Sequence, residues 1–261
     1  MKRPLLLVFI NTFGFILTII LNGLAVYLPL NGKTTGELSD MYPNLFVPSG
    51  VTFSIWGIIY LLLLLFVLYQ WFAVFSSSRD ESFIYQIGPW FFVSSLANSS
   101  WILAWHFVFP VVSLAIMIVL LFSLIKIYTS LNIGKTLTSV SEKMIVHSCF
   151  SVYLGWITVA TIANVTTVLV SLGWDGGGIH PAIWTIIMIV IASLIGMFFT
   201  WSRRDYLYAF VIIWALFGIY LKRNDLHDSS AIVLAAQVGM ISNAIVILFR
   251  MMQKWLIRTP Q

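Results

Sequence analysis

The side chains of this chain that are best suited to chemistry are aromatic and amide groups inside long hydrophobic segments. Residues 53–60 read FSIWGIIY, residues 98–101 read NSSW, and residues 153–156 read YLGW. In hydrocarbon, an amide or indole N–H without a hydrogen-bond partner costs free energy, so such groups face protein or a ligand rather than lipid. Aromatic faces stack on flat apolar molecules, and N–H groups fix their orientation. The patterns therefore predict binding of a hydrophobic aromatic small molecule.

Helical spacing places these groups on shared faces. Three stripes recur at intervals of three or four residues: Phe53, Trp56 and Tyr60; Ser94, Asn98, Trp101 and Trp105; and Tyr153, Trp156, Ala160 and Asn164. At about 1.5 Å per residue, four members lie roughly 10–15 Å from the same end of their segments: Tyr60, Asn98, Trp101 and Asn164. This common depth favours one cavity. Helix–helix packing is the alternative, because small residues let helices approach and Asn side chains bridge them.

Ionisable groups give little support for catalysis. No Asp, Glu, Lys or Arg lies near the middle of a hydrophobic segment, and no two histidines are spaced three or four residues apart. Paired carboxylates, or a His beside a nucleophile, would be needed for acid–base chemistry. We therefore predict no catalytic residues, no metal site and no cofactor. The single cysteine, Cys149, is expected to be a small buried hydrophobic residue.

Composition identifies the elements that must position these groups. Hydrophobic residues make up 60% of the chain, charged residues only 9%, and the mean hydropathy is +0.98. A helix needs about 20 apolar residues to cross a bilayer. Eight segments qualify: 5–29, 51–75, 86–108, 110–131, 144–172, 181–201, 206–222 and 231–255. The sequence thus predicts an all-α, polytopic membrane helical bundle of about eight transmembrane helices.

The basic residues test this topology. With eight spans and a cytoplasmic N-terminus, eleven Lys and Arg residues fall on the inner side, whereas the outer side has only Lys33, Lys222 and Arg223. This positive-inside bias places both termini in the cytoplasm. The expected location is the plasma (inner) membrane. Because topology accounts for the net charge of +5, the charge gives no reason to expect a nucleic-acid partner.

Two connections organise the chain. The outer loop 31–50 is punctuated by Gly and Pro and carries Phe46 among its apolar residues. It either folds over the mouth of the bundle as a lid or rests in the headgroup layer. The Gly-rich turn at 174–178 predicts a boundary between a front part, residues 1–175, and an extension of three transmembrane helices, residues 176–261.

The same residues carry a family resemblance. Over roughly residues 5–172, the chain resembles the TspO/peripheral benzodiazepine receptor family, also called tryptophan-rich sensory proteins. The matching positions, in order and spacing, are Pro48, Phe53, Trp56 and Tyr60 in the second span, Asn98 and Trp101 in the third, and Tyr153, Leu154, Trp156, Ala160 and Asn164 in the fifth. Ser54 and Val152 stand where the family usually has Pro, and the last three spans are absent from the five-helix family core.

The resemblance implies a helical bundle that binds porphyrins, or in some members sterols or synthetic aromatic ligands, in a pocket closed by the first loop. The predicted ligand-binding residues are Phe46, Phe53, Trp56, Tyr60, Asn98, Trp101, Trp105, Tyr153, Trp156, Ala160 and Asn164. Such a protein would be a receptor that senses or regulates without converting its ligand. A small-molecule transporter is the main alternative, and a membrane enzyme acting on lipid or pigment is less favoured. The lipid bilayer and the hydrophobic ligand are the expected partners. A homodimer is a further partner that the sequence allows.

Overall fold

The fold is built from helices throughout the described part of the chain, which comprises residues 3–28, 30–76, 80–227 and 229–258 of a computed structural model. The predicted all-α fold is therefore confirmed. The long helices within these residues are α1 Arg3–Tyr27, α3 Ile55–Phe75, α5 Trp90–His106, α6 Pro110–Ser130, α8 Ser148–Ser171, α9 Pro181–Arg203, α10 Tyr206–Leu226 and α11 Ser230–Arg258. The short helices are α2 Thr35–Asp40, α4 Ser82–Ile87 and α7 Val140–Glu142.

Seven of the described helices are long and apolar enough to cross a membrane. The exception is α5, which was expected over 86–108 but begins at Trp90 and has 17 residues. Gly88 adopts φ 54°, and Pro89 follows it, so the chain ends α4 before α5 begins. Seventeen residues extend about 26 Å at 1.5 Å per residue, near the lower limit for a span. The expected start of this segment was wrong by four residues.

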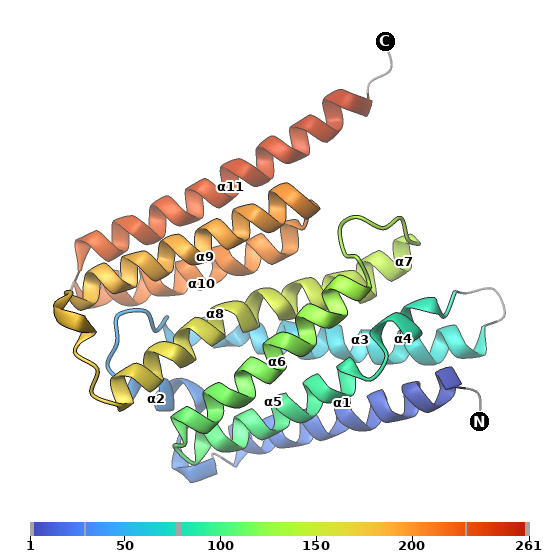
Figure 1. Cartoon of the computed structure of the whole chain (residues 1–261), viewed down its shortest axis with the longest axis horizontal. Helices are drawn as coiled ribbons and strands as arrows, with labels where there is room; N and C mark the ends of the chain where they lie inside the picture. Colours follow the sequence, from blue (N-terminus) through green and yellow to red (C-terminus); the bar gives the residue numbers. More distant parts are fainter. Residues whose placement is uncertain (1–2, 29, 77–79, 228, 259–261) are drawn as a thin grey trace.

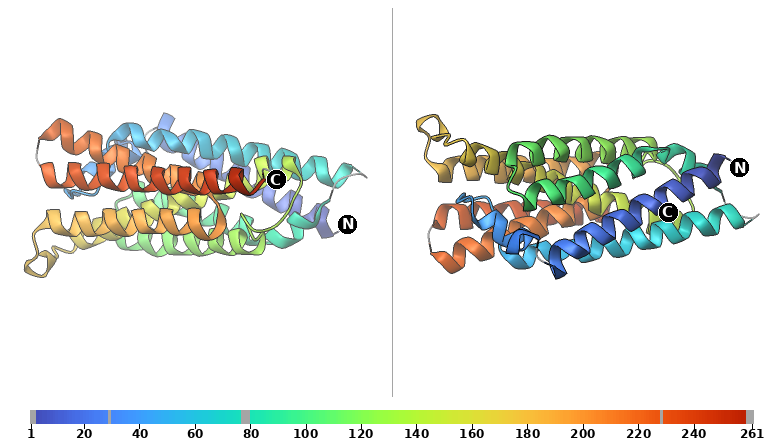
Figure 2. Two further views of the ribbon diagram at one scale, coloured as in Figure 1. Left: turned by 90° about the horizontal axis from the view of Figure 1, so that it is seen from above. Right: turned by 90° about the horizontal axis from the view of Figure 1, so that it is seen from below.

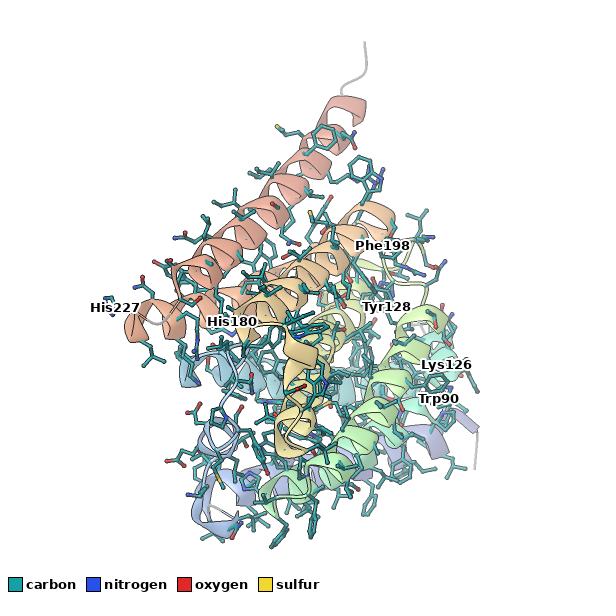
Figure 3. All side chains as sticks on the ribbon, turned by 60° about the vertical axis from the view of Figure 1, so that its left-hand side comes forward. Trp90, Lys126, Tyr128, His180, Phe198 and His227 are labelled. Atoms are coloured by element: carbon teal, nitrogen blue, oxygen red, sulfur yellow. The ribbon has the colours of Figure 1, made fainter. Side chains whose placement is uncertain are left out.

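The long helices run side by side, and α5 packs along α6 (Figure 1; Figure 2). One end of the bundle carries α2 and the α8–α9 connection, and we call it the lid end. The start of α1 and the end of α11 lie at the opposite end, called here the terminal end (Figure 1). Figure 3 places His180 and His227 toward the lid end, with Lys126 and Trp90 toward the terminal end. Because α1 begins and α11 ends at the same end of the bundle, the arrangement is consistent with an even number of membrane crossings.

Local sequence signals set several helix boundaries. Pro110 and Pro181 occupy the first positions of α6 and α9, where the missing N–H of proline costs nothing. Arg204 and His227 adopt the left-handed conformation and end α9 and α10. The long α8 continues from a π-helical turn at Lys143–His147, so the expected segment 144–172 is one continuous helical path.

The last three helices pack against the first five through α10, which contacts α8 as well as α9 and α11. A Cβ atom on Gly155 of α8 would lie 3.1 Å from the Val211 side chain, so this glycine allows close approach. At the terminal end, Asp205 caps α10 and accepts hydrogen bonds from Tyr128 Oη at 2.8 Å and Ser151 Oγ at 2.7 Å. Burial raises the pKa of the Asp205 carboxyl. The predicted boundary at residues 175/176 stays a prediction.

Candidate ligand cavity beneath the lid

The loop 31–50, called the lid below, folds back over the bundle. Its helix α2 begins with a capping box, in which Glu37 N donates to Thr34 Oγ1 and Thr34 N donates to Glu37 Oε2 at 2.7 Å. The Glu37 carboxylate accepts hydrogen bonds from both the backbone N–H and the hydroxyl of Thr34, and these two bonds lower its pKa. Leu38, Phe46 and Val47 of the lid are buried. Of the two arrangements that the sequence left open, the structure has the folded lid.

Hydrogen bonds tie one side of the lid to the end of α5. Trp105 Nε1 donates to the carbonyl of Thr35 at 3.2 Å. The imidazole of His106 lies 3.0 Å from Leu30 O and 3.3 Å from Thr35 Oγ1, and Asn31 Nδ2 donates to the His106 carbonyl. The buried His106 therefore positions the lid through its imidazole and its backbone carbonyl.

Trp56 of α3 is the centre of an aromatic cluster under the lid. Its ring stacks on Tyr60 at 5.5 Å and on Trp101 at 6.2 Å between centroids. It meets Tyr153 and Trp156 of α8 edge-on, at 6.1 and 6.3 Å. These separations are typical of favourable aromatic pairs. Side chains from three predicted stripes, on separate helices, thus converge at one place.

Within this cluster lies a cavity of about 40 Å³. Its lining consists of Thr35, Ser39, Pro48, Phe53, Trp56, Trp101, Trp105, Trp156, Val159, Ala160, Ala163 and Asn164. The volume is close to the roughly 30 Å³ that one water occupies in the liquid. In this closed state the aromatic rings fill the space by stacking on one another. A larger molecule can enter only if the rings and the lid move apart.

A second cavity of about 340 Å³ lies on the other side of Phe53 and Trp56, which line both spaces. Tyr60 and Asn22 line this second cavity together with α2. Thr35 of α2 also lines both cavities, so three residues lie between the closed cavity and the larger one beneath the same lid. Movement of Phe53 and Trp56 would join them.

The polar groups of the site differ in whether they have hydrogen-bond partners within the protein. Trp101 Nε1 donates to Asn164 Oδ1 at 3.2 Å, and Ser113 Oγ donates to the same oxygen at 3.3 Å. Trp156 is only 3% exposed, yet its Nε1 has no hydrogen-bond partner within the described residues. A buried donor without an acceptor costs about 1–3 kcal/mol. Trp156 is therefore the lining residue whose bonding capacity is left for an added molecule.

The structure brings together seven of the eleven predicted site residues as lining of the closed cavity: Phe53, Trp56, Trp101, Trp105, Trp156, Ala160 and Asn164. The expectation of a common depth is met for Trp101 and Asn164, whose side chains are bonded to each other. Tyr60 faces the second cavity instead. That any of these residues binds a ligand stays a prediction.

The remaining predicted residues lie outside both linings. Asn98 Nδ2 donates to Tyr153 Oη at 2.9 Å, and Asn22 Nδ2 donates to Asn98 Oδ1 at 2.8 Å. This chain joins α1, α5 and α8 below the cavity, so Asn98 and Tyr153 have the helix-bridging role that was the alternative. Phe46 is buried in the packing of the lid and does not line either space.

Sequence reasoning missed three polar contributors. Thr35 and Ser39 enter the closed cavity from α2, and Asn22 enters the second cavity from α1. The spacing of Thr18 and Asn22, which places both on one face of α1, was an available signal. Among the described residues, no three His, Cys, Asp or Glu side chains are grouped to hold a metal ion.

The fold and site together define a multi-pass helical membrane protein with an aromatic cavity closed by an extramembrane loop. Comparison with known families matches residues 8–249 to the family described as TSPO-like protein. The chain therefore belongs to this family. The match continues beyond the resemblance seen over residues 5–172 and includes α9 and α10. No curated protein and no solved structure matches the chain.

Proposed function

We propose that this protein binds a flat, aromatic, tetrapyrrole-like small molecule beneath the lid and acts as a sensor or regulator. The observation that carries the proposal is the unpartnered indole N–H of the buried Trp156, in a cavity lined by five aromatic rings. A planar ligand would stack on these rings while a nitrogen or oxygen acceptor on it receives the Trp156 N–H. The site offers no acid–base pair, so we propose binding without conversion.

Ligand binding must open the closed cavity. Ligand pockets usually enclose about 300–1,000 Å³, well above the 40 Å³ of the closed cavity. Displacing Phe53 and Trp56 toward the second cavity would add its roughly 340 Å³. The ligand would then replace ring–ring stacking within the protein by ring–ligand stacking, and lid movement would report occupancy at the surface.

We further propose an orientation for this site. The terminal end, which holds most of the basic residues in the eight-span topology, would face the cytoplasm of the plasma membrane. The lid end, with Lys33, Lys222 and Arg223, would face the exterior. The lid would then be reached from outside the cell or from the outer leaflet.

Replacing Trp156 by Phe tests the binding role. The change keeps an aromatic ring but removes a donor that has no partner in the protein. If the N–H binds a ligand, affinity for protoporphyrin IX, measured by tryptophan fluorescence quenching in nanodiscs, should fall about tenfold. Because Trp156 is buried, the smaller Phe side chain should also lower the thermal midpoint through lost packing, so the affinity of the folded protein is the deciding measurement.

The matched control is Trp201→Phe, at a residue that is 54% exposed at the terminal end of α9. It should leave porphyrin affinity unchanged. If Trp156→Phe lowers the thermal midpoint while the folded protein binds as tightly as before, Trp156 only packs helices, and the cavity is not a binding site.

A further inference from the structure

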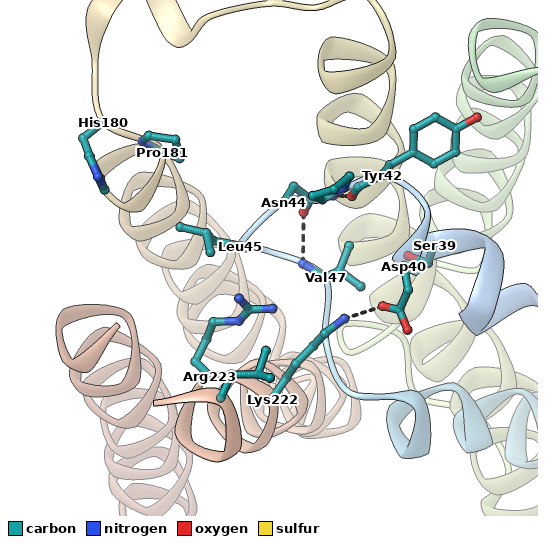
Figure 4. Close-up of a pocket in the computed structure, with 12 residues that line it drawn as sticks. Ser39, Asp40, Tyr42, Asn44, Leu45, Val47, His180, Pro181, Lys222 and Arg223 are labelled. Carbon is teal, nitrogen blue, oxygen red and sulfur yellow. Dashed lines mark hydrogen bonds and ion pairs between the residues drawn. The ribbon is translucent and has the colours of Figure 1, made fainter. Parts of the chain in front are cut away.

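A separate cavity of about 590 Å³ lies between the lid and the ends of α9 and α10 (Figure 4). Lid residues 39–47 form one wall. The opposite wall contains His180 and Pro181 at the start of α9, and Lys222 and Arg223 near the end of α10. Its volume falls in the range of small-molecule sites. None of its lining belongs to the aromatic cluster.

Charge distinguishes this cavity, called the cationic cavity below, from the closed cavity among the aromatic rings, called the aromatic cavity below. Asp40 is the only acidic residue among the described residues that line it, against two basic ones. Arg223 is 4% exposed, so one positive charge is held in a desolvated wall. Figure 4 shows the ends of the Lys222 and Arg223 side chains turned toward the lid segment, with Lys222 paired to Asp40. The wall is suited to an anionic group.

The ion pair between Lys222 and Asp40 is exchangeable. The Asp40 side chain is 59% exposed, whereas that of Lys222 is 21% exposed. Asp40 can therefore return to water at little cost if another anion takes its place, because an exposed carboxylate loses little hydration in the pair. Exchange of one anion for another would leave Lys222 with a partner in both states.

The two cavities meet at the lid. Ser39 lines both the cationic cavity and the aromatic cavity. Val47 lines the first, and the next residue, Pro48, lines the second. A single layer of lid thus separates the aromatic rings from Lys222. A molecule whose flat body lies against the rings could reach Lys222 with a side group once the lid shifts.

We propose that the cationic cavity binds a carboxylate of the aromatic ligand and that Lys222 exchanges Asp40 for this carboxylate on binding. The inference rests on the proposed function and narrows its ligand class to amphipathic molecules with an anionic arm. Lys33, an exposed lid residue, does not line any of these cavities and is not part of the site.

The test compares protoporphyrin IX, which has two carboxylates, with its uncharged dimethyl ester. Affinities are measured by fluorescence quenching in phosphatidylcholine nanodiscs. Lys222→Gln should weaken protoporphyrin IX about tenfold, as expected for one charge-assisted hydrogen bond, and leave the ester unchanged. Asp40→Asn removes the competing anion, so it should tighten protoporphyrin IX severalfold relative to the ester, which serves as the reference because Asp40 also lines the second cavity. Lys33→Gln is the control and should alter neither.

Ester binding also shows that each variant is folded. If Lys222→Gln and Asp40→Asn weaken both probes, the ion pair only closes the lid, and the inference is wrong. If neither variant changes either affinity, the inference fails while the proposed function stands. If added phosphatidylglycerol competes with protoporphyrin IX in the wild type but not in Lys222→Gln, the cationic cavity binds a lipid phosphate, and the inference that it binds the carboxylate of the ligand is wrong. If neither probe binds the wild type, the proposed function itself is refuted, and this inference falls with it.

Discussion

The contact between Gly218 of α10 and the base of the lid gives a sharp test of how the lid is held. A Cβ atom on Gly218 would lie 1.9 Å from Thr52 Oγ1 and 2.9 Å from both Thr52 Cβ and Pro48 Cβ. Two hydrogen bonds fix the same contact: Ser49 N donates to Gly218 O at 3.0 Å, and Trp214 Nε1 donates to Thr52 O at 2.9 Å. The lid base therefore depends on a residue without a side chain.

Gly218→Ala should displace the lid base. To reach ordinary contact at 3.4 Å, the Thr52 hydroxyl must move by about 1.5 Å from its 1.9 Å position. Rotation of Thr52 about χ1 can move its hydroxyl, but it leaves both Cβ atoms too close, so the backbone of 48–52 must shift. Overpacking of this kind costs about 1–3 kcal/mol. Because Pro48 lines the aromatic cavity, the shift should also loosen its closure.

The assay combines thermal unfolding in detergent with stopped-flow binding of protoporphyrin IX. Gly218→Ala should lower the thermal midpoint and raise both the association and dissociation rates of the porphyrin. Thr52→Ser in the same background should not rescue it, since the Cβ contacts persist. Gly57→Ala is the matched control, because a Cβ there meets nothing within 4 Å. Wild-type stability together with wild-type rates in Gly218→Ala would refute the reasoning.

Two further outcomes test the anchor at the terminal end and the topology. Burial raises the pKa of Asp205, so above about pH 4 the native state binds more protons than the unfolded state. The thermal midpoint of the wild type, measured relative to that of Asp205→Asn, should therefore fall as pH rises from about 4 to neutral. A difference that stays constant with pH would contradict this expectation. Reporters at both termini and in 132–143 should lie in the cytoplasm and one in 31–50 outside, whereas an external C-terminus would mean an odd number of spans.

Hydrophobicity and helical periodicity predicted the parts of the fold that depend on local sequence. The long segments follow from run length, and the buried helix faces that carry Trp101 and Asn164 follow from side chains three or four residues apart. The start of α5 at Trp90 rather than at residue 86 was also readable, because a Gly-Pro pair at 88–89 is a typical helix break. These signals act within one helix or between neighbouring ones.

Contacts between distant segments were not predictable in this way. Lys222 and Asp40 are 182 residues apart, and periodicity carries no information on which helix end receives the lid. For the same reason Asn98 was expected in the cavity, although its partners on α1 and α8 hold it beneath. A stripe shows which face of a helix is buried, but the partner that buries it is decided by tertiary packing.

The position of α10 shows why the last three helices matter for the site. At the lid end, Trp214, Gly218 and Lys222 are four residues apart on one face, and all three contact the lid or its base. At the other end of the same helix, Asp205 is bonded to α6 and α8. A displacement of the lid therefore acts on a helix that is anchored in the first five helices. Because a helix transmits movement as a rigid element, α10 mechanically joins the first five long helices to the last three at the candidate cavity.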